Sequence, residues 1–189
     1  MRNRIVMAFC AASIACTTSD YGTLEAASLT VSPCEDHQPR TFAPFHFEAN
    51  LMRWFAAEGV ATIEMRTGYR AATISDIAVL QFADTDDVRR RFVQDPATRF
   101  SVDGDAIRLS VVLSQTCPDA TQPLVAVSGS LAFREFEPWK GGHIAGEGTV
   151  VLADARSDRS AVPLVKDVRL AFSMKVRSGP PYEDFTNWR

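Results

Sequence analysis

Residues 166–177, KDVRLAFSMKVR, decide the fold class, because apolar and polar side chains alternate along them. The two alternating sets are Val168, Leu170, Phe172, Met174 and Val176 against Arg169, Ala171, Ser173, Lys175 and Arg177. A repeat of two residues is the period of a β-strand, whose successive side chains point to opposite faces. One apolar and one polar face are typical of an antiparallel sheet that covers a core on one side and meets water on the other.

The same alternation recurs in the stretches 45–55, 59–67 and 106–117. Asp103-Gly104 and Gly141-Gly142 each stand between two such stretches, and dipeptides of this kind favour tight hairpin turns. We therefore predict an all-β fold, an antiparallel β-sandwich of about eight or nine strands. A closed barrel around an internal cavity is the alternative architecture.

One segment breaks the alternation. Residues 83–96, ADTDDVRRRFVQDP, place acids first, then three arginines, and end at Asp95-Pro96. Early acids and late bases suit the dipole of a helix, so we predict one short helix near 85–93. The arginines at 89–91 either form a solvated helix face or contact anionic lipid headgroups.

The amino-terminal end has the pattern of an export signal. Arg2 and Arg4 precede an apolar run of eleven residues, 5–15. A membrane-spanning helix needs about 20 apolar residues, whereas the apolar part of a secretory signal needs only 7–15. The sequence therefore predicts a signal peptide over residues 1–15.

The end of this run, Ser13-Ile14-Ala15-Cys16, resembles the lipobox of bacterial lipoproteins, although Ser13 stands where leucine is usual. The resemblance implies that Cys16 is lipidated and becomes the first residue of a membrane-anchored protein. It also implies that Thr17, where the family carries aspartate for retention in the inner membrane, favours the outer membrane. The alternative is ordinary cleavage near Ala15 or Ala26, which leaves a soluble secreted protein.

The composition of the mature chain limits the kinds of partner that it can bind. Residues 16–28 are small and polar and predict a flexible tether, which leaves 29–189 for the β-sandwich domain. Removal of the signal leaves 18 basic and 23 acidic residues, a net charge of −5. This acidic balance argues against nucleic acid as a partner.

The four cysteines have different expected fates. Cys10 leaves with the signal and Cys16 takes lipid, so Cys34 and Cys117 remain as a pair in an exported protein. We expect them to form a disulfide, which in the loop-entropy model contributes about 4–5 kcal/mol. A pair of buried thiols is the alternative, and without a CxxC motif a zinc site is not expected.

The candidates for chemistry are few. His46 and Glu48 share one face of a strand, and His37 lies near them in sequence, so these three are the weak candidates for a metal site. A polar strand face explains them without a metal, and we expect neither a metal nor a cofactor. The sequence has no G-x-S-x-G nucleophile elbow, and the catalytic residues, if any, stay unknown.

Aromatic residues near strand ends are the remaining candidates for binding. Trp54, Trp139, Tyr182 and Trp188 offer large rigid surfaces for a protein or a glycan, unless they pack in the core. We therefore expect a non-enzymatic lipoprotein of the cell envelope that binds a protein, glycan or lipid partner. The alternatives are an envelope hydrolase with a metal or histidine site and a β-barrel lipid carrier.

Overall fold

The computed structural model describes residues 20–31, 40–57, 60–68, 75–103, 105–113, 123–154 and 164–177. These residues form twelve strands and one helix. In chain order the elements are β1 (Tyr21–Ala26), β2 (Leu29–Val31), β3 (Arg40–Phe42), β4 (Phe45–Glu48), β5 (Leu51–Ala57), β6 (Val60–Arg66), β7 (Ile77–Phe82), α1 (Thr85–Gln94), β8 (Arg99–Ser101), β9 (Ile107–Val112), β10 (Leu124–Phe136), β11 (His143–Asp154) and β12 (Leu164–Lys175).

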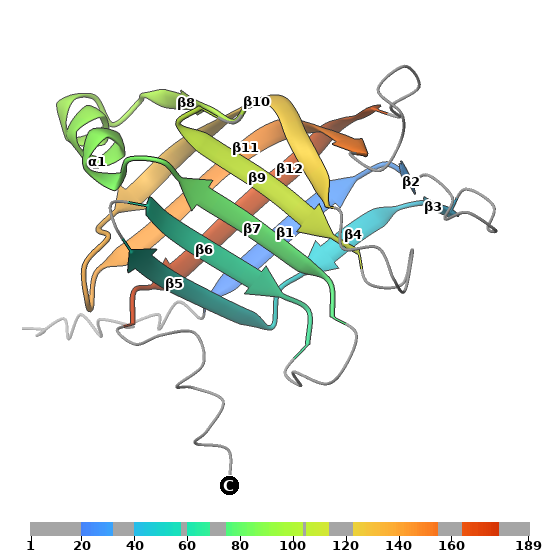
Figure 1. The fold of residues 1–189 in the computed structure, drawn as a ribbon, viewed down its shortest axis with the longest axis horizontal. Coiled ribbons are helices and arrows are strands. Elements are labelled where there is room, and N and C mark those ends of the chain that lie inside the picture. The colour runs from blue at the N-terminus through green and yellow to red at the C-terminus, as the bar shows by residue number, and fades with distance from the viewer. Residues whose placement is uncertain are drawn as a thin grey trace, which may run out of the picture.

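Ten of the strands form one antiparallel sheet that curls into a half-barrel (Figure 1). The order is β4-β1-β12-β11-β10-β9-β7-β6-β5, with β8 beside β10, and β2 and β3 form a small second sheet. The predicted all-β antiparallel fold with one short helix is confirmed. A sandwich would have two separate sheets, whereas here one continuous sheet folds over so that its two halves form the two layers. The structure also has more strands than the expected eight or nine, because it includes short strands such as β2, β3 and β8.

The sheet is curled by a short connection between its two edge strands, β4 and β5. Between them, the Ala49 N–H donates to the Gly22 carbonyl in β1 (2.7 Å), and the Asn50 N–H donates to the Arg66 carbonyl at the end of β6 (2.8 Å). The chain thus passes from one edge of the sheet to the other within two residues. Because both edges are tied to this corner, the sheet must bend around a common interior.

Aromatic side chains fill that interior. Phe133 of β10 lies at the centre, with ring centroids 4.7 Å from Phe136, 5.4 Å from Phe100, 6.0 Å from Phe82 and 6.3 Å from Phe172. All five rings are at most 3% exposed. Contacts of this density are typical of a solid protein core.

The predicted faces of β12 are confirmed. The five predicted inward residues, from Val168 to Val176, are at most 3% exposed, whereas Arg169, Lys175 and Arg177 are exposed on the other face. Helix α1 also matches its prediction, since Asp84 caps its start by accepting from the Asp87 N–H (2.9 Å).

The flexible tether expected over 16–28 is wrong from Tyr21 on. Residues 21–26 form β1, which pairs with β12 on one side and with β4 on the other. The segment has little apolar side chain of its own, but pairing on both edges satisfies its backbone and buries Leu24 completely. Residues 1–19 lie outside the described part of the chain, and so does the lipobox-like stretch 13–16.

Candidate functional site

The register of the strands places mostly polar side chains in rows across the outer face of the sheet. One row runs from Glu48 in β4 to Arg99 in β8 through Thr23, Ala171, Glu147 and Ala132. The next row runs from His46 to Ser101 through Glu25, Arg169, Thr149 and Ser130. Six strands therefore contribute to one continuous surface, which is polar except at Ala171 and Ala132.

A groove of about 340 Å³ lies across these two rows. Ala171 and Ala132 line it, and their methyl groups leave the surface low between longer neighbours. Glu25, Glu147, Arg99 and Arg169 also line the groove, which is open on its outer side. The volume is within the range of small-molecule and peptide sites, about 300–1,000 Å³.

The four charged groups of the groove are not paired with one another. Glu25 contacts His46 instead, at 3.3 Å, and Arg99 contacts the Ser130 hydroxyl at 3.5 Å. Among the described residues, Glu147 and Arg169 have no ion pair within 4.0 Å. Glu147 and Arg169 are therefore the pair of opposite charges most available to a ligand, while Glu25 and Arg99 each make one contact outside the set of four.

A hydrogen-bonded array of three side chains borders the groove. His143 of β11 contacts the Glu135 carboxylate through Nδ1 (2.9 Å) and the Ser173 hydroxyl through Nε2 (3.1 Å). Beside it, Arg134 donates to the Tyr21 hydroxyl at 2.7 Å, so this bridge spans β11 and β12. Sequence reasoning did not find this array, because its three residues are brought together only by the pairing of β10, β11 and β12.

The array has the order of a Ser-His-Glu triad, but its setting does not suit a nucleophile. Ser173 is only 4% exposed and lies two residues before the end of β12, paired with Tyr21 on one side and Ala145 on the other. A serine nucleophile needs access to its substrate and N–H donors directed at the developing oxyanion. Here the backbone around Ser173 belongs to the sheet ladder, so the array joins β10, β11 and β12 on their outer face.

Of the three residues considered for a metal site, the structure describes two, His46 and Glu48. His46 lies between Glu25 and Glu48, with nitrogen–oxygen distances of 3.3 and 3.6 Å. In the described ranges, no group of three or more metal-ligating side chains has the arrangement to hold an ion. His37 lies outside the described residues.

The aromatic candidates divide into two kinds. The expectation that Trp54 is available for binding is wrong, because its side chain is 8% exposed and packs on Phe82 with ring centroids 5.8 Å apart. Trp139 is 46% exposed on the β10–β11 connection, with the Arg89 guanidinium 5.0 Å from its ring centroid. Tyr182 and Trp188 lie outside the described residues, as do Cys34 and Cys117, so the disulfide stays a prediction.

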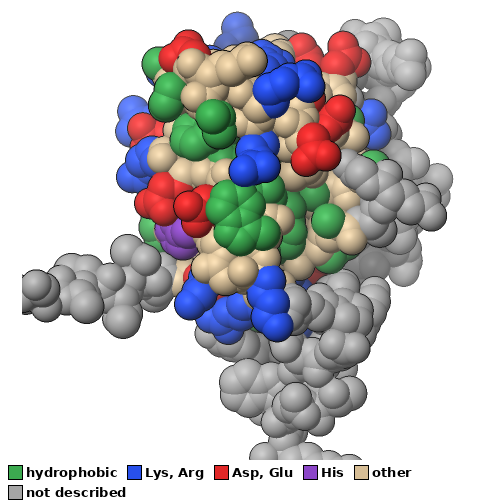
Figure 2. Space-filling view, turned by 90° about the vertical axis from the view of Figure 1, so that its left-hand side faces the viewer, with side chains coloured by type: hydrophobic (Ala, Val, Ile, Leu, Met, Phe, Trp, Pro, Cys, Tyr) green, Lys and Arg blue, Asp and Glu red, His purple; other side chains and the backbone are tan. Residues whose placement is uncertain are grey.

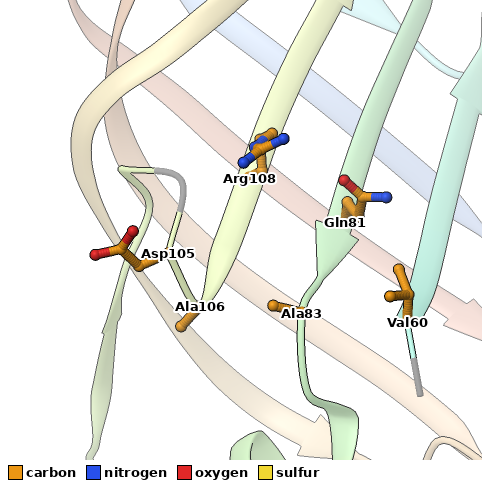
Figure 3. Close-up of a pocket in the computed structure, with 6 residues that line it drawn as sticks. All are labelled: Val60, Gln81, Ala83, Asp105, Ala106 and Arg108. Atoms are coloured by element: carbon orange, nitrogen blue, oxygen red, sulfur yellow. The ribbon is translucent and has the colours of Figure 1, made fainter.

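A second hollow lies on the outer face at the other side of the sheet. Arg108 and Gln81 stand side by side on β9 and β7, above Ala83 and Ala106 (Figure 3). Its volume is about 130 Å³. This is well below the usual size of a ligand pocket, so the groove is the stronger candidate site.

Comparison with known proteins gives no relative: no protein-family model, no curated protein and no solved structure matches the chain. Within the described residues, no helix is long and apolar enough to cross a membrane. The functional interpretation therefore depends on the groove and on the export signal that the sequence predicts.

Proposed function

We propose that the mature chain is a lipid-anchored, non-enzymatic binding protein of the cell envelope that holds a polar partner in the groove. The observation that carries this proposal is the set of four charged side chains, two of each sign, that line the groove without pairing with one another. Such charges orient a ligand by complementarity and discriminate against partners of uniform charge. Lipidation of Cys16 keeps the domain in the envelope, and Thr17 favours the outer membrane.

The chemistry of the groove favours a protein segment over a glycan. Sugars commonly stack on aromatic rings, but the floor of the groove contains the methyl groups of Ala171 and Ala132. An extended peptide offers both carboxylate and ammonium groups to Glu25, Glu147, Arg99 and Arg169. The partner that fits best is therefore an exposed segment of an envelope protein with mixed charge.

The packed interior gives no support to a lipid carrier, because the rings around Phe133 occupy the space that a lipid would need. A hydrolase with a histidine site has one observation in its favour, the Glu135–His143–Ser173 array. The burial of Ser173 speaks against it. The groove is the feature that is both open and chemically distinctive.

A photo-crosslinking amino acid at Ala171 tests the proposal in intact cells. The expected result is a discrete crosslinked protein, absent when the crosslinker stands at Val127, which is 45% exposed and does not line the groove. Exchanging the two charges in Arg169→Glu/Glu147→Arg keeps the net charge of the chain and should abolish the product. Equal crosslinking from both positions, or a product that survives the exchange, contradicts the proposal.

Anchoring is tested separately by mass spectrometry of the protein isolated from membranes. The expected amino-terminal residue is an acylated Cys16, and the matched variant Cys16→Ser should appear in the soluble fraction. An unmodified terminus further along the chain contradicts the anchor and leaves the crosslinking test of the groove intact.

A further inference from the structure

The first described residue is fixed to one end of the sheet. The Asp20 carboxylate accepts a hydrogen bond from the Lys175 backbone N–H (2.9 Å) and contacts the Arg177 guanidinium (3.3 Å). Only four peptide steps separate Cys16 from Asp20, and an extended chain covers at most about 14 Å in that distance. A lipid on Cys16 would therefore hold this end of the sheet at the membrane surface, whatever conformation the link adopts.

The same end carries an exposed tryptophan on the β10–β11 connection. This connection is bonded to the end of β12, since the Gly141 N–H donates to the Val176 carbonyl (2.8 Å) and the Val176 N–H donates to the Gly142 carbonyl (2.9 Å). Trp139, beside Lys140, therefore lies on the end where Asp20 is fixed. Val93, which is 68% exposed one helical turn beyond Arg89, adds apolar surface from α1.

Charged side chains of both signs border this apolar surface (Figure 2). Figure 2 faces this end of the molecule and shows hydrophobic side chains in the centre, Lys and Arg side chains above and below them, and Asp and Glu side chains to the left and at the upper right. The described charged residues of the β10–β11 connection and its flanks, and of the end of β12, are Arg134, Lys140, Lys175 and Arg177 against Asp20, Glu135 and Glu137, and Arg89 of α1 lies over Trp139. Asp20 pairs with Arg177 and Glu135 with His143, which leaves Arg89, Arg134, Lys140 and Lys175 against Glu137 without an ion pair among the described residues, a positive balance around Trp139.

We infer that this end, which we call the membrane end and define by Trp139, Lys140, Lys175 and Arg177 with Arg89 of α1, docks on an anionic lipid surface. The inference rests on the proposed anchor for its orientation. Tryptophan is enriched at the boundary between headgroups and acyl chains, because its ring is apolar and its N–H is polar. Basic residues next to a lipid anchor supply a second attachment, which a single acyl chain needs for stable binding.

Docking in this way gives the groove a defined position. The rows that form the groove pass through Ala171 and Arg169, two and three outward-facing positions from Lys175 along β12. With Trp139 in the interface, the outer face would stand upright from the membrane, and the groove would open sideways toward neighbouring envelope proteins. The anchor alone fixes the distance to the membrane, whereas the membrane end would fix the orientation.

The test uses the processed protein isolated from membranes and reconstituted into vesicles that contain phosphatidylglycerol and a brominated lipid. Bromine quenches tryptophans that enter the bilayer interface, and the contribution of Trp139 is the difference between the natural chain and Trp139→Phe. We expect quenching of Trp139 that is lost in Lys140→Glu/Lys175→Glu and is weaker in vesicles of phosphatidylcholine alone. The matched control is Lys166→Glu, an exposed lysine on the opposite end of the same strand, which should leave the quenching unchanged.

The outcomes separate this inference from the anchor. If Cys16 is acylated but the natural chain and Trp139→Phe are quenched equally, the anchor stands and the membrane end is overturned. If Cys16 is unmodified, the anchor fails, and cosedimentation of the same protein with phosphatidylglycerol vesicles decides the inference. Binding that falls about fivefold for each removed cation supports it, and no binding overturns it.

Discussion

The inner and outer faces of the same strands have different roles. Phe133 points into the aromatic core and is 3% exposed, while its neighbour Arg134 crosses the outer face to the Tyr21 hydroxyl. The inner face is apolar and tightly packed, so each side chain depends on its neighbours. The outer face is polar and its contacts are few, so its residues can change with little effect on the fold and are available for binding.

The largest effect should come from the centre of the core. Phe133→Ala removes the ring that contacts four other aromatic rings and leaves a cavity behind. Substitutions of this kind lower the free energy of unfolding by about 3–5 kcal/mol. The measurement is equilibrium unfolding in urea, followed by tryptophan fluorescence.

The adjacent Arg134→Ala is the matched control, because it removes one exposed hydrogen bond from the other face. We expect it to cost about 0.5–1.5 kcal/mol. If both variants lose the same stability, the contrast between the two faces is broken.

The alternation of residue types was sufficient to predict these faces in several strands. In β12, Val168 to Val176 lie inside as expected, and β6 and β9 likewise bury their predicted apolar sets. Burial of every second residue depends on local sequence only, so it can be recognised without knowing the partner strand. The helix was also predictable, because its cap and its charges lie within one short segment.

Features that depend on strand pairing could not be predicted in the same way. Asp103-Gly104 does not join a hairpin as expected, since β8 pairs with β10 while β9 pairs with β7 and with the other end of β10. The groove draws its residues from distant strands, and only the register places them together.

The Glu135–His143–Ser173 array depends in addition on a β-bulge. Between Phe133 and Glu135 the register shifts by one residue, so Arg134 and Glu135 both face outward. Strict alternation would have pointed Glu135 into the core. No repeating pattern of apolar residues indicates such a shift.

The next largest effect should come from a glycine at which two backbones approach closely. A Cβ atom on Gly148 of β11 would lie 2.3 Å from the Ser130 carbonyl oxygen and 3.1 Å from the Leu131 Cα. Gly148→Ala should therefore push β10 and β11 apart and cost about 1–3 kcal/mol. Thermal unfolding by circular dichroism measures this.

The control for this prediction is Gly141→Ala on the β10–β11 connection. A Cβ there meets no atom within 4 Å, although its φ of +85° disfavours other residues. The strain of one such residue is about 1–2 kcal/mol and leaves the sheet unchanged. Loss of near-ultraviolet dichroism in Gly148→Ala alone would show that the core had been disturbed, and its retention would contradict the prediction.

A smaller effect is expected for the outer-face array. Ser173→Ala removes the hydroxyl that contacts His143 and should cost about 0.5–1.5 kcal/mol in chemical unfolding. Ser110→Ala on the outer face of β9, whose hydroxyl makes no hydrogen bond within the described part of the chain, should cost less. Ser173 should also resist a fluorophosphonate probe, since it is buried, and covalent labelling of Ser173 would overturn its structural role.

The smallest effect should appear at Asp103, on the exposed turn after β8. Hydrogen bonds from the Ser101 hydroxyl and then from the Asp105 backbone N–H hold the pKa of the Asp103 carboxyl below its ordinary value. A carboxyl with a lower pKa in the folded chain stabilises the fold above about pH 4, and this contribution is lost as the pH falls through the folded pKa. Because the side chain is exposed to water, the contribution is small.

NMR titration should find the pKa of Asp103 below the ordinary value and nearer to it in Ser101→Ala. Ser130→Ala, which removes the neighbouring hydroxyl in the same row, should leave that pKa unchanged. A pKa that does not respond to Ser101→Ala would contradict the Ser101 hydroxyl as its cause, and a pKa that responds to Ser130→Ala would show that outer-face contacts are coupled, which would weaken the contrast with the inner face.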